Sequence, residues 1–311
     1  MDSYRYAMAE AVQKAVEEYP NVYVITADLA RAEKLDNLLL PGQQYIPVGI
    51  SENNMMCMAA GLSTTGLIPI IVGFAMFTAC RSFEQIRNTI AYSNFNVKII
   101  ATHGGICVGK DGATHQAMED LALMRVLPNM TVLCASDAAQ TKAAIQTMIE
   151  HKGPVYLRLG RDATPQIYDT MPEVRIGGSD LLKEGKDILI IGTGSIVSKA
   201  LEAAKELERD GIHATVLNTY SIKPLDQSSI LHWAKICQSV IVVEDHFTAG
   251  GLGSAVCELL CEHNPMPVRR IGIGDTFGES GTEEQLFEKY GIAKRFIIEA
   301  AKTMCKKGGK Q

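Results

Sequence analysis

The predicted architecture rests on the stretch VKIIATHGGICVGKDGATHQAMEDLALMR, residues 97–125. Residues 97–103 form a short apolar run, which is typical of a strand buried in a parallel sheet. A glycine-rich loop with several titratable side chains follows, and we expect a helix to begin near His115. A strand that leads through a loop into a helix is the repeating unit of parallel α/β folds, so this stretch predicts that class.

The same unit recurs on both sides of this stretch. In the first half the candidate strands are residues 22–28, 44–49, 68–73, 97–103, 131–136 and 155–160, and the helical segments are residues 52–66, 81–94 and 138–153. In the second half the strands are residues 187–194, 213–220, 239–246 and 268–275, and the helical segments are residues 198–211, 225–237 and 250–263. This alternation predicts a parallel sheet covered by helices on both faces in each half.

A break in the alternation predicts two domains. Residues 166–186 mix prolines, glycines and charged side chains, which is typical of a linker. We therefore expect one domain over residues 1–165 and a second over residues 187–311. The chain length of 311 residues agrees with two domains.

The composition excludes several classes of protein. The chain is 47% hydrophobic and 21% charged, with a net charge of -5, which argues against a nucleic-acid-binding protein. The most apolar stretch, residues 66–77, is too short to span a membrane and contains Pro69. The N-terminus lacks the basic region and apolar run of a signal peptide. The scattered cysteines described next are typical of a cytoplasmic protein, which is the expected location.

The eight cysteines are scattered through apolar segments, and we interpret them as reduced, buried residues. Cys257 and Cys261 lie on one predicted helix, with His263 nearby. A stripe facing the core is the preferred interpretation, because no second ligand pair follows at zinc-site spacing. We predict no metal site in this chain.

Ligands of parallel sheets bind beyond the carboxyl ends of the strands, so residues that directly follow strands are the candidates for function. They are Asp28, Glu52, and residues 74–77, 103–115, 136–137 and 158–161. Glu52 follows one strand and precedes a helix, so its carboxylate either serves a ligand or only favours the positive end of the helix dipole. The histidines and aspartate of residues 103–115 suit acid–base chemistry or the binding of substrate hydroxyls, whereas a solvated surface loop is the alternative. Many glycines beside these groups favour close approach to a ligand.

Two other glycine-rich turns carry weaker signals. Residues 190–195 contain only G-x-G, with Val197 where a dinucleotide fingerprint has its third glycine, so a tight turn is preferred. Residues 243–256 are interpreted as a helix start with close packing. The chain has no P-loop, H-E-x-x-H, G-x-S-x-G or C-x-x-C motif, which leaves nucleotide-hydrolase, zincin and serine-hydrolase functions without support.

Taken together, these segments resemble the transketolase family. The most specific is H-x-G-x-x-V-G-x-D-G-x-x-H-Q-x-x-E-D, which begins at His103. In the family's order the chain also contains VGISENNMMCMAAGLS, GFAMFTACRSFEQIR, GPVYLRLGR, SIKPLD, VEDHFTAGGLGSAV and FGESGTEEQLFEKYGI. The resemblance covers nearly the whole chain and implies a pyrimidine-binding domain followed by a transketolase C-terminal domain. No GDG occurs here, so the family's diphosphate- and metal-binding domain, with its GDG…N motif, has no counterpart. The chain is thus similar to the C-terminal subunit of a split, two-chain transketolase.

The resemblance implies thiamine diphosphate as the cofactor. Glu52 matches the catalytic glutamate that hydrogen-bonds the aminopyrimidine ring, and Phe74 and Phe77 match the aromatic wall against that ring. Asp28 matches an aspartate near the cofactor at the subunit interface. An N-terminal transketolase subunit with the GDG…N motif would hold Mg²⁺ (or Ca²⁺ or Mn²⁺), and two copies of each chain would form a heterotetramer.

The resemblance also implies the substrate side of the site. His103 and His115 match catalytic residues that contact the sugar, and Asp111 matches a residue that binds its hydroxyls. Arg5, His103 and Arg161 match a grip on the terminal phosphate of a sugar phosphate. A guanidinium suits that task because its planar donors bind an anion in pairs.

The sequence departs from the family at two positions near this grip. Ala32 stands where a serine is common, and Lys110 stands where an acidic residue is usual. Arg161 could also be structural and pair with a linker carboxylate such as Asp169. The departures concern the identity of the substrate more than the chemistry.

The implied function is the transfer of a two-carbon ketol unit from a ketose, most simply a sugar phosphate, to an aldose. The alternatives are a deoxyxylulose-phosphate-synthase-like enzyme, the β subunit of a 2-oxo acid dehydrogenase, and a non-catalytic partner subunit. Residues 103–115 fit a transketolase better than a dehydrogenase, and the synthase is normally one long chain. Retention of Glu52, Asp111, His115 and Arg161 argues against a non-catalytic chain.

Overall fold

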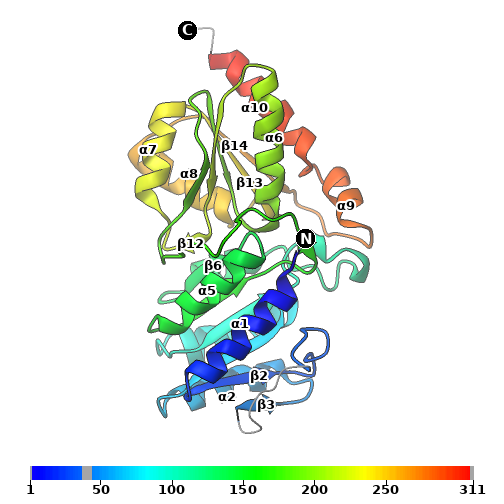
Figure 1. Cartoon of the computed structure of the whole chain (residues 1–311), viewed down its shortest axis with the longest axis vertical. Coiled ribbons are helices and arrows are strands. Elements are labelled where there is room, and N and C mark those ends of the chain that lie inside the picture. Colours follow the sequence, from blue (N-terminus) through cyan, green and yellow to red (C-terminus); the bar gives the residue numbers. More distant parts are fainter. Residues whose placement is uncertain (1, 37–43, 309–311) are drawn as a thin grey trace.

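The computed structural model describes residues 2–36 and 44–308, whose strands gather into two α/β units stacked along the long axis of the molecule (Figure 1). The α/β class predicted from the alternation of strands and helices is confirmed. Among the described residues, no helix combines the length and apolar character that a membrane crossing needs.

The first sheet has seven strands in the order β12-β6-β7-β5-β4-β2-β3. All its neighbours are parallel except β12, which runs antiparallel to β6. The strands are β2 (Val22–Thr26), β3 (Tyr45–Pro47), β4 (Ile68–Phe74), β5 (Lys98–Thr102), β6 (Thr131–Cys134), β7 (Val155–Arg158) and β12 (Ser221–Lys223).

Helices cover both faces of this sheet. Helices α1 (Tyr4–Glu18) and α5 (Ala138–Glu150) lie side by side on one face, as Figure 1 shows. The other face is covered by α2 (Glu52–Ser63), the helical segments η1 (Met76–Arg81), α3 (Phe83–Gln85) and η2 (Ile86–Ala91), and α4 (Asp120–Val126). In β4, Ile71 packs toward the second group while Ile70 and Val72 pack toward the first, because successive side chains of a strand point to opposite faces.

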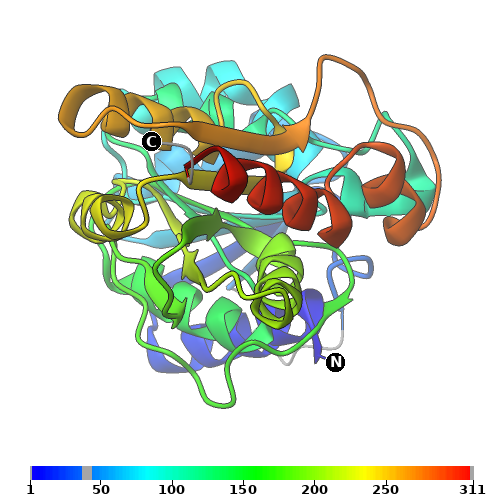
Figure 2. The ribbon, with the colours of Figure 1, turned by 90° about the horizontal axis from the view of Figure 1, so that it is seen from above.

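The second sheet has five strands in the order β14-β13-β10-β11-β9, with only β9 antiparallel to its neighbour. They are β9 (Asp180–Lys183), β10 (Ile188–Gly192), β11 (Ala214–Asn218), β13 (Val240–Phe247) and β14 (Val268–Ile273). The helices around them are η4 (Gly194–Ile196), α6 (Val197–Arg209), α7 (Gln227–Cys237), α8 (Leu252–His263), α9 (Glu283–Lys289) and α10 (Lys294–Gly308). Figure 2 shows α10 running alongside β14.

The predicted linker is shorter in the structure than in the sequence analysis. Asp180–Lys183, which we had assigned to residues 166–186, forms the edge strand β9 of the second sheet. Strand β12 also crosses the predicted division, because it follows β11 in the chain yet pairs with β6 of the first sheet. The two halves are thus joined by a shared strand as well as by the linker.

Two helix predictions need correction. No helix begins at His115: residues 106–111 form the short 3-10 helix η3 (Ile106–Asp111), turns follow, and α4 begins at Asp120. The positive φ of Gly109 and Gly112 ends the winding of η3, and Ala117 then pairs with Gly104 as an isolated β-bridge, so no helix forms before Asp120. Residues 81–94 are helical but not a regular α-helix, because the π-helical η2 lies within them. The π-helical η1 precedes them and carries Phe77 and Arg81 into the site described below.

Candidate active site

Four strand ends of the first sheet carry predicted functional residues to one edge. Asp28 follows β2, Phe74 ends β4, His103 follows β5, and Arg161 follows β7. Because these strands are parallel, their carboxyl ends lie at the same edge. The contacts below show which of these side chains meet there.

The carboxylate of Glu52 is buried at the first turn of α2, where 5% of the residue is exposed. Its Oε2 accepts a hydrogen bond from Nη1 of Arg81 at 3.1 Å. The half-exposed Arg81 guanidinium also lies 5.5 Å from the centroid of the Phe77 ring. No partner for Oε1 is found among the described residues, so this oxygen is available to a ligand.

Aromatic rings continue from Glu52 toward the histidines. Phe74 and Phe77 lie nearly parallel, with centroids 5.8 Å apart. Phe74 stacks on His103 at 3.7 Å, and the ring of His115 meets Phe77 edge-on at 5.4 Å. The structure thus brings the predicted Glu52, Phe74, Phe77, His103 and His115 into one continuous surface.

His103 is buried and held in an unusual backbone conformation. Only 2% of the residue is exposed, and its φ of 58° lies in the left-handed region, which non-glycine residues adopt mostly at constrained sites. Its Nδ1 lies 2.7 Å from Oγ1 of Thr102. Burial, together with the positive charges of Arg5 and Arg161, lowers the pKa of His103 to about 2. This imidazole is therefore neutral near pH 7, so it could contribute a hydrogen bond but no charge to the predicted phosphate grip, and that role stays a prediction.

Arg5 and Arg161 lie together at the rim of the site. The pairing of β1 (Asp2–Ser3) with β8 (Ala163–Thr164) places the start of α1 beside the end of β7. Nε of Arg5 donates to the carbonyl of Arg161 at 3.0 Å, and Nη1 donates to that of Ala32 at 2.9 Å. The carboxylate of Asp162 lies 3.3 Å from Arg5 and 4.0 Å from Arg161.

The pairing of Arg161 differs from the alternative considered in the sequence analysis. Its carboxylate neighbours in the described chain are Asp162 and Asp111, the latter at 3.8 Å, and Asp169 is not one of them. Nη1 of Arg161 also donates to the carbonyl of Val108 at 2.7 Å, which ties η3 to the end of β7. Two predicted substrate residues, Asp111 and Arg161, are thus neighbours.

Few polar contacts in the described chain are made by Asp28, Lys110 and His115. Asp28 is exposed, with a left-handed φ of 61°. Lys110 is exposed on η3, and His115 is partly buried with Nδ1 2.9 Å from the hydroxyl of Thr114. The roles of Asp28, Asp111 and His115 stay predictions.

Two side chains of this site, Arg81 and Glu33, were not predicted from the sequence. Arg81 lies in a segment quoted for its resemblance, but nothing in its spacing indicated a pair with Glu52. Glu33 follows the divergent Ala32, and the structure buries it completely, with Oε1 accepting a hydrogen bond from Thr102 at 2.6 Å. The sequence offered one indication of Glu33, namely a charged residue directly after Ala32, which departs from the family pattern.

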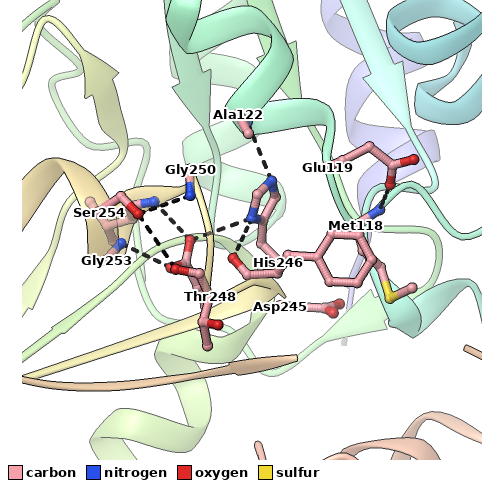
Figure 3. Close-up of polar contacts among 12 residues, drawn as sticks. Met118, Glu119, Ala122, Asp245, His246, Thr248, Gly250, Gly253 and Ser254 are labelled. Atoms are coloured by element: carbon pink, nitrogen blue, oxygen red, sulfur yellow. Dashed lines mark hydrogen bonds and ion pairs between the residues drawn. The ribbon is translucent and has the colours of Figure 1, made fainter. Parts of the chain in front are cut away.

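The end of β13, in the second sheet, contacts the loop that follows β5 in the first sheet. The carboxylate of Asp245 accepts hydrogen bonds from the backbone amides of Ile106 at 2.8 Å and Cys107 at 3.2 Å. Figure 3 shows His246 reaching Ala122, whose amide lies 3.3 Å from Nε2. The turn predicted as a close-packed helix start therefore also positions η3 and α4.

The cysteines differ in part from the prediction. All eight are free, but only Cys107, Cys134 and Cys237 are buried. Cys57 and Cys261 are exposed, so the predicted core-facing stripe on α8 is wrong at Cys261, where Val256, Leu259 and Leu260 face the core instead. Within residues 2–36 and 44–308, no group of three or more His, Cys, Asp or Glu side chains is arranged to hold a metal ion.

Comparison with known proteins assigns both halves of the chain to described domains. Residues 2–167 match the model of the transketolase pyrimidine-binding domain, and residues 177–297 match that of the transketolase C-terminal domain. The two sheets therefore correspond to the pyrimidine-binding domain and the C-terminal domain of transketolases. The chain belongs to the transketolase family, as its sequence motifs predicted.

Its relatives include chains of similar length. It is 41% identical over 307 residues to a protein of Methanocaldococcus jannaschii named as a transketolase C-terminal section, covering 96% of both chains. It is 39% identical to the 6-deoxy-6-sulfo-D-fructose transketolase subunit SqwH of Clostridium sp., covering 96% of this chain and 92% of that one. A solved structure described as a split-gene transketolase, inactive beta4 tetramer, superposes with a TM-score of 0.90 at 43% identity and 98% coverage of both chains.

The depressed pKa of His103 predicts a pH-dependent stability. Below about pH 6.5 the unfolded chain binds a proton on this ring that the folded chain does not, so folding stability falls by about 1.4 kcal/mol per pH unit. Replacing His103 with Asn, which tolerates the left-handed backbone, should remove about 2 kcal/mol of the loss between pH 6.5 and 5. Urea unfolding of both proteins at the two pH values measures this difference. An equal loss of stability in both would show that His103 is protonated in the folded chain.

Proposed function

We propose that this chain is the C-terminal subunit of a two-chain, thiamine-diphosphate-dependent transketolase that moves a two-carbon ketol unit from a ketose to an aldose. The observation that carries the proposal is the buried carboxylate of Glu52, with one oxygen that has no partner in the described chain. Its partner Arg81 also lies over the ring of Phe77, which pairs with Phe74. The similarity to transketolase subunits of the same length supports it.

The residues present fit the aminopyrimidine end of thiamine diphosphate. Oε1 of Glu52 has no partner in the described chain, and a ring nitrogen is a suitable one. The apolar faces of Phe74 and Phe77 suit a flat heterocycle and exclude water from the carboxyl group. The bound cofactor supplies the carbon nucleophile of the reaction, and the protein supplies orientation and proton positions.

The polar residues of the site divide between the cofactor and the sugar. Glu52 holds a proton at Oε1, toward the ring. His103, Asp111 and His115 bind the hydroxyls of the sugar, where a neutral imidazole can either accept or donate a hydrogen bond. Asp28 lies near the cofactor at the interface with the partner subunit.

A second chain is needed for the other end of the cofactor. The sequence has no GDG, so we assign the diphosphate and its Mg²⁺, Ca²⁺ or Mn²⁺ to a partner subunit that carries GDG…N. The related split-gene protein described as an inactive beta4 tetramer supports this division, because its chains assemble without activity. We propose a heterotetramer with two copies of each chain, in line with the closed symmetry of most oligomers.

The charged rim points to an acidic substrate. The carboxylate neighbours of Arg5 and Arg161 are Asp162 and Asp111, at 3.3 to 4.0 Å and not deeply buried, so a ligand anion can take their place. We propose that Arg5 and Arg161 bind the terminal anion of the sugar in this way, most simply a phosphate. The eight free cysteines suit a reducing compartment, and we propose the cytoplasm as the location.

The first prediction from this proposal concerns Glu52. Glu52→Gln keeps the shape of the side chain but removes the acid, so turnover of the assembled enzyme should fall by about 10²–10⁴-fold. Steady-state kinetics at saturating thiamine diphosphate measures this. Glu18→Gln, on the exposed end of α1, is the matched control and should keep wild-type turnover. Near-normal turnover of Glu52→Gln would remove this residue from the mechanism.

Assembly gives the second prediction. The isolated chain should bind thiamine diphosphate and Mg²⁺ weakly or not at all, because it carries only the pyrimidine half of the site. Adding the GDG-containing partner should produce tight binding in isothermal titration calorimetry. Micromolar binding of the cofactor by the isolated chain would contradict the division of the site between two chains.

The third prediction concerns the anion. Arg161→Ala should raise KM for the acidic sugar about ten- to a hundredfold, with a smaller change in kcat, because a charge-assisted hydrogen bond contributes about 1.5–3 kcal/mol. A neutral sugar without the acidic group should be a poor substrate of the wild type and lose little more in the variant. Arg175→Ala, which removes an exposed guanidinium from the linker, is the control. Because Arg161 also holds the carbonyl of Val108, equal losses for both sugars would mean that it only supports η3.

A further inference from the structure

Glu33 is a buried acid beside the proposed site that the mechanism above does not use. None of its surface is exposed, and its Oε2 has no hydrogen-bond partner in the described chain. Its Oε1 accepts a hydrogen bond from Oγ1 of Thr102 at 2.6 Å, and the same hydroxyl lies 2.7 Å from Nδ1 of His103. These three residues form a chain of hydrogen bonds, the Glu33 relay, which ends on the imidazole of the site.

A structural role as the counter-ion of Arg5 does not explain this side chain. The guanidinium of Arg5 is already bonded to the carbonyls of Ala32 and Arg161 and to Asp162. A buried carboxylate with one unbonded oxygen destabilises a fold, so a neutral side chain would serve packing better. An acid at this position can accept the hydrogen bond from Thr102 and so act on His103, whereas an apolar residue cannot.

Counting protons along the Glu33 relay fixes the tautomer of His103. The hydroxyl of Thr102 carries a single hydrogen, and an ionised Glu33 can only accept. Thr102 must then donate to Glu33, and its oxygen accepts from His103, whose proton therefore sits on Nδ1. For Nε2 no partner is found among the described residues, and it is left with a free lone pair.

We propose that Glu33 is a positioning residue that acts through Thr102, holding the ring proton of His103 on Nδ1 so that Nε2 accepts a hydrogen bond from a hydroxyl of the sugar. The assignment of the sugar to His103 rests on the proposed function, whereas the tautomer rests on the Glu33 relay alone. The stacking of the His103 ring on Phe74 at 3.7 Å fixes the plane in which Nε2 points. The geometry of the acceptor is thus set before the substrate binds.

Protonation of Glu33 reverses the Glu33 relay. Because Oε2 has no partner, a proton on Glu33 is satisfied only on Oε1, where it donates to Thr102. Thr102 then donates to Nδ1, and the proton of His103 moves to Nε2, which becomes a donor. Burial raises the pKa of Glu33 to about 7. The hydrogen bond from Thr102 and the positive charge of Arg5 on α1 act in the opposite direction, but their effect is smaller. The charged groups that act on His103 itself are Arg5, Arg161 and His115, and its own pKa stays far below this range. Nε2 is therefore an acceptor above about pH 7 and a donor below it.

The test reads the tautomer directly by NMR of the full chain labelled with ¹⁵N-histidine. The sequence contains seven histidines, and the signals lost in His103→Asn identify those of His103. At pH 8.5 we expect the shift pattern of an imidazole protonated on Nδ1, and on lowering the pH to 6 we expect the pattern of protonation on Nε2. Glu33→Gln cannot ionise, so whichever tautomer it adopts should stay the same between these pH values.

Substitutions of Thr102 provide the matched pair. Thr102→Val has the same shape but no hydroxyl and should lose the pH-dependent change, whereas Thr102→Ser should keep it. If Thr102→Val does not fold, Glu33→Gln alone decides the matter. A proton on Nε2 of the wild type at pH 8.5, or the same tautomer change in Glu33→Gln as in the wild type, would overturn the proposal.

A kinetic measurement on the assembled enzyme separates this inference from the proposed function. The ionisation near pH 7 should be absent from the pH profile of kcat/KM in Glu33→Gln, and Thr102→Val should raise KM for the donor sugar about tenfold while Thr102→Ser stays near the wild type. An assembled enzyme without transketolase activity would reject the proposed function, and the NMR result would still decide the Glu33 relay. An active enzyme with unchanged pH profiles in the Glu33 variant would reject only the positioning role.

Discussion

The rest of the structure depends on the burial of one positive charge, the guanidinium of Arg158 at the end of β7. Only 4% of this residue is exposed, and it donates to the carboxylate of Asp120 at 3.0 Å and to the carbonyl of Asp245 at 2.8 Å. Gly104 lies against it so closely that a Cβ there would be 2.4 Å from Nε. Since a buried charge is tolerated only with its partners in place, α4, the loop after β5 and the end of β13 share one arrangement. This requirement fixes the loop that carries the candidate site to both sheets.

Around that centre, the cations of the site already have carboxylate neighbours. The pairs are Arg81 with Glu52, Arg161 with Asp111, and Arg5 with Asp162. The pairs of Arg161 and Arg5 lie near the surface, so each contributes little to stability and can be exchanged for contacts with a ligand. In the third pair only Arg81 is half exposed, and Glu52 is buried. His103, by contrast, is neutral and Glu33 is buried, so the inner wall of the site is defined by hydrogen bonds and the rim by charge.

The sequence predicted those parts of the structure that depend on local pattern. The alternation of apolar strands and helices was enough for the two parallel sheets, and positions after strand ends were enough to select Glu52, Phe74 and His103 as candidates. Strand β12 escaped prediction because Ser221–Lys223 pairs with β6, which lies far away in the chain, and no periodicity reports such a partner. The start of α4 was misjudged because Ala117 pairs with Gly104 in a β-bridge, a contact that no helical pattern reports. The neutral state of His103 and the relay through Thr102 depend on burial and on distances between side chains, which residue types alone do not give.

Strand β12 also has a consequence for how this polypeptide can be divided. A fragment that stops at the end of the first domain would lack Ser221–Lys223 and leave the hydrogen-bonding groups of β6 without their neighbour. An unprotected strand edge of this kind invites pairing with other copies and aggregation. The domain boundary seen in the sequence is therefore not a point of clean dissection, and the two halves of the chain behave as interleaved rather than modular units.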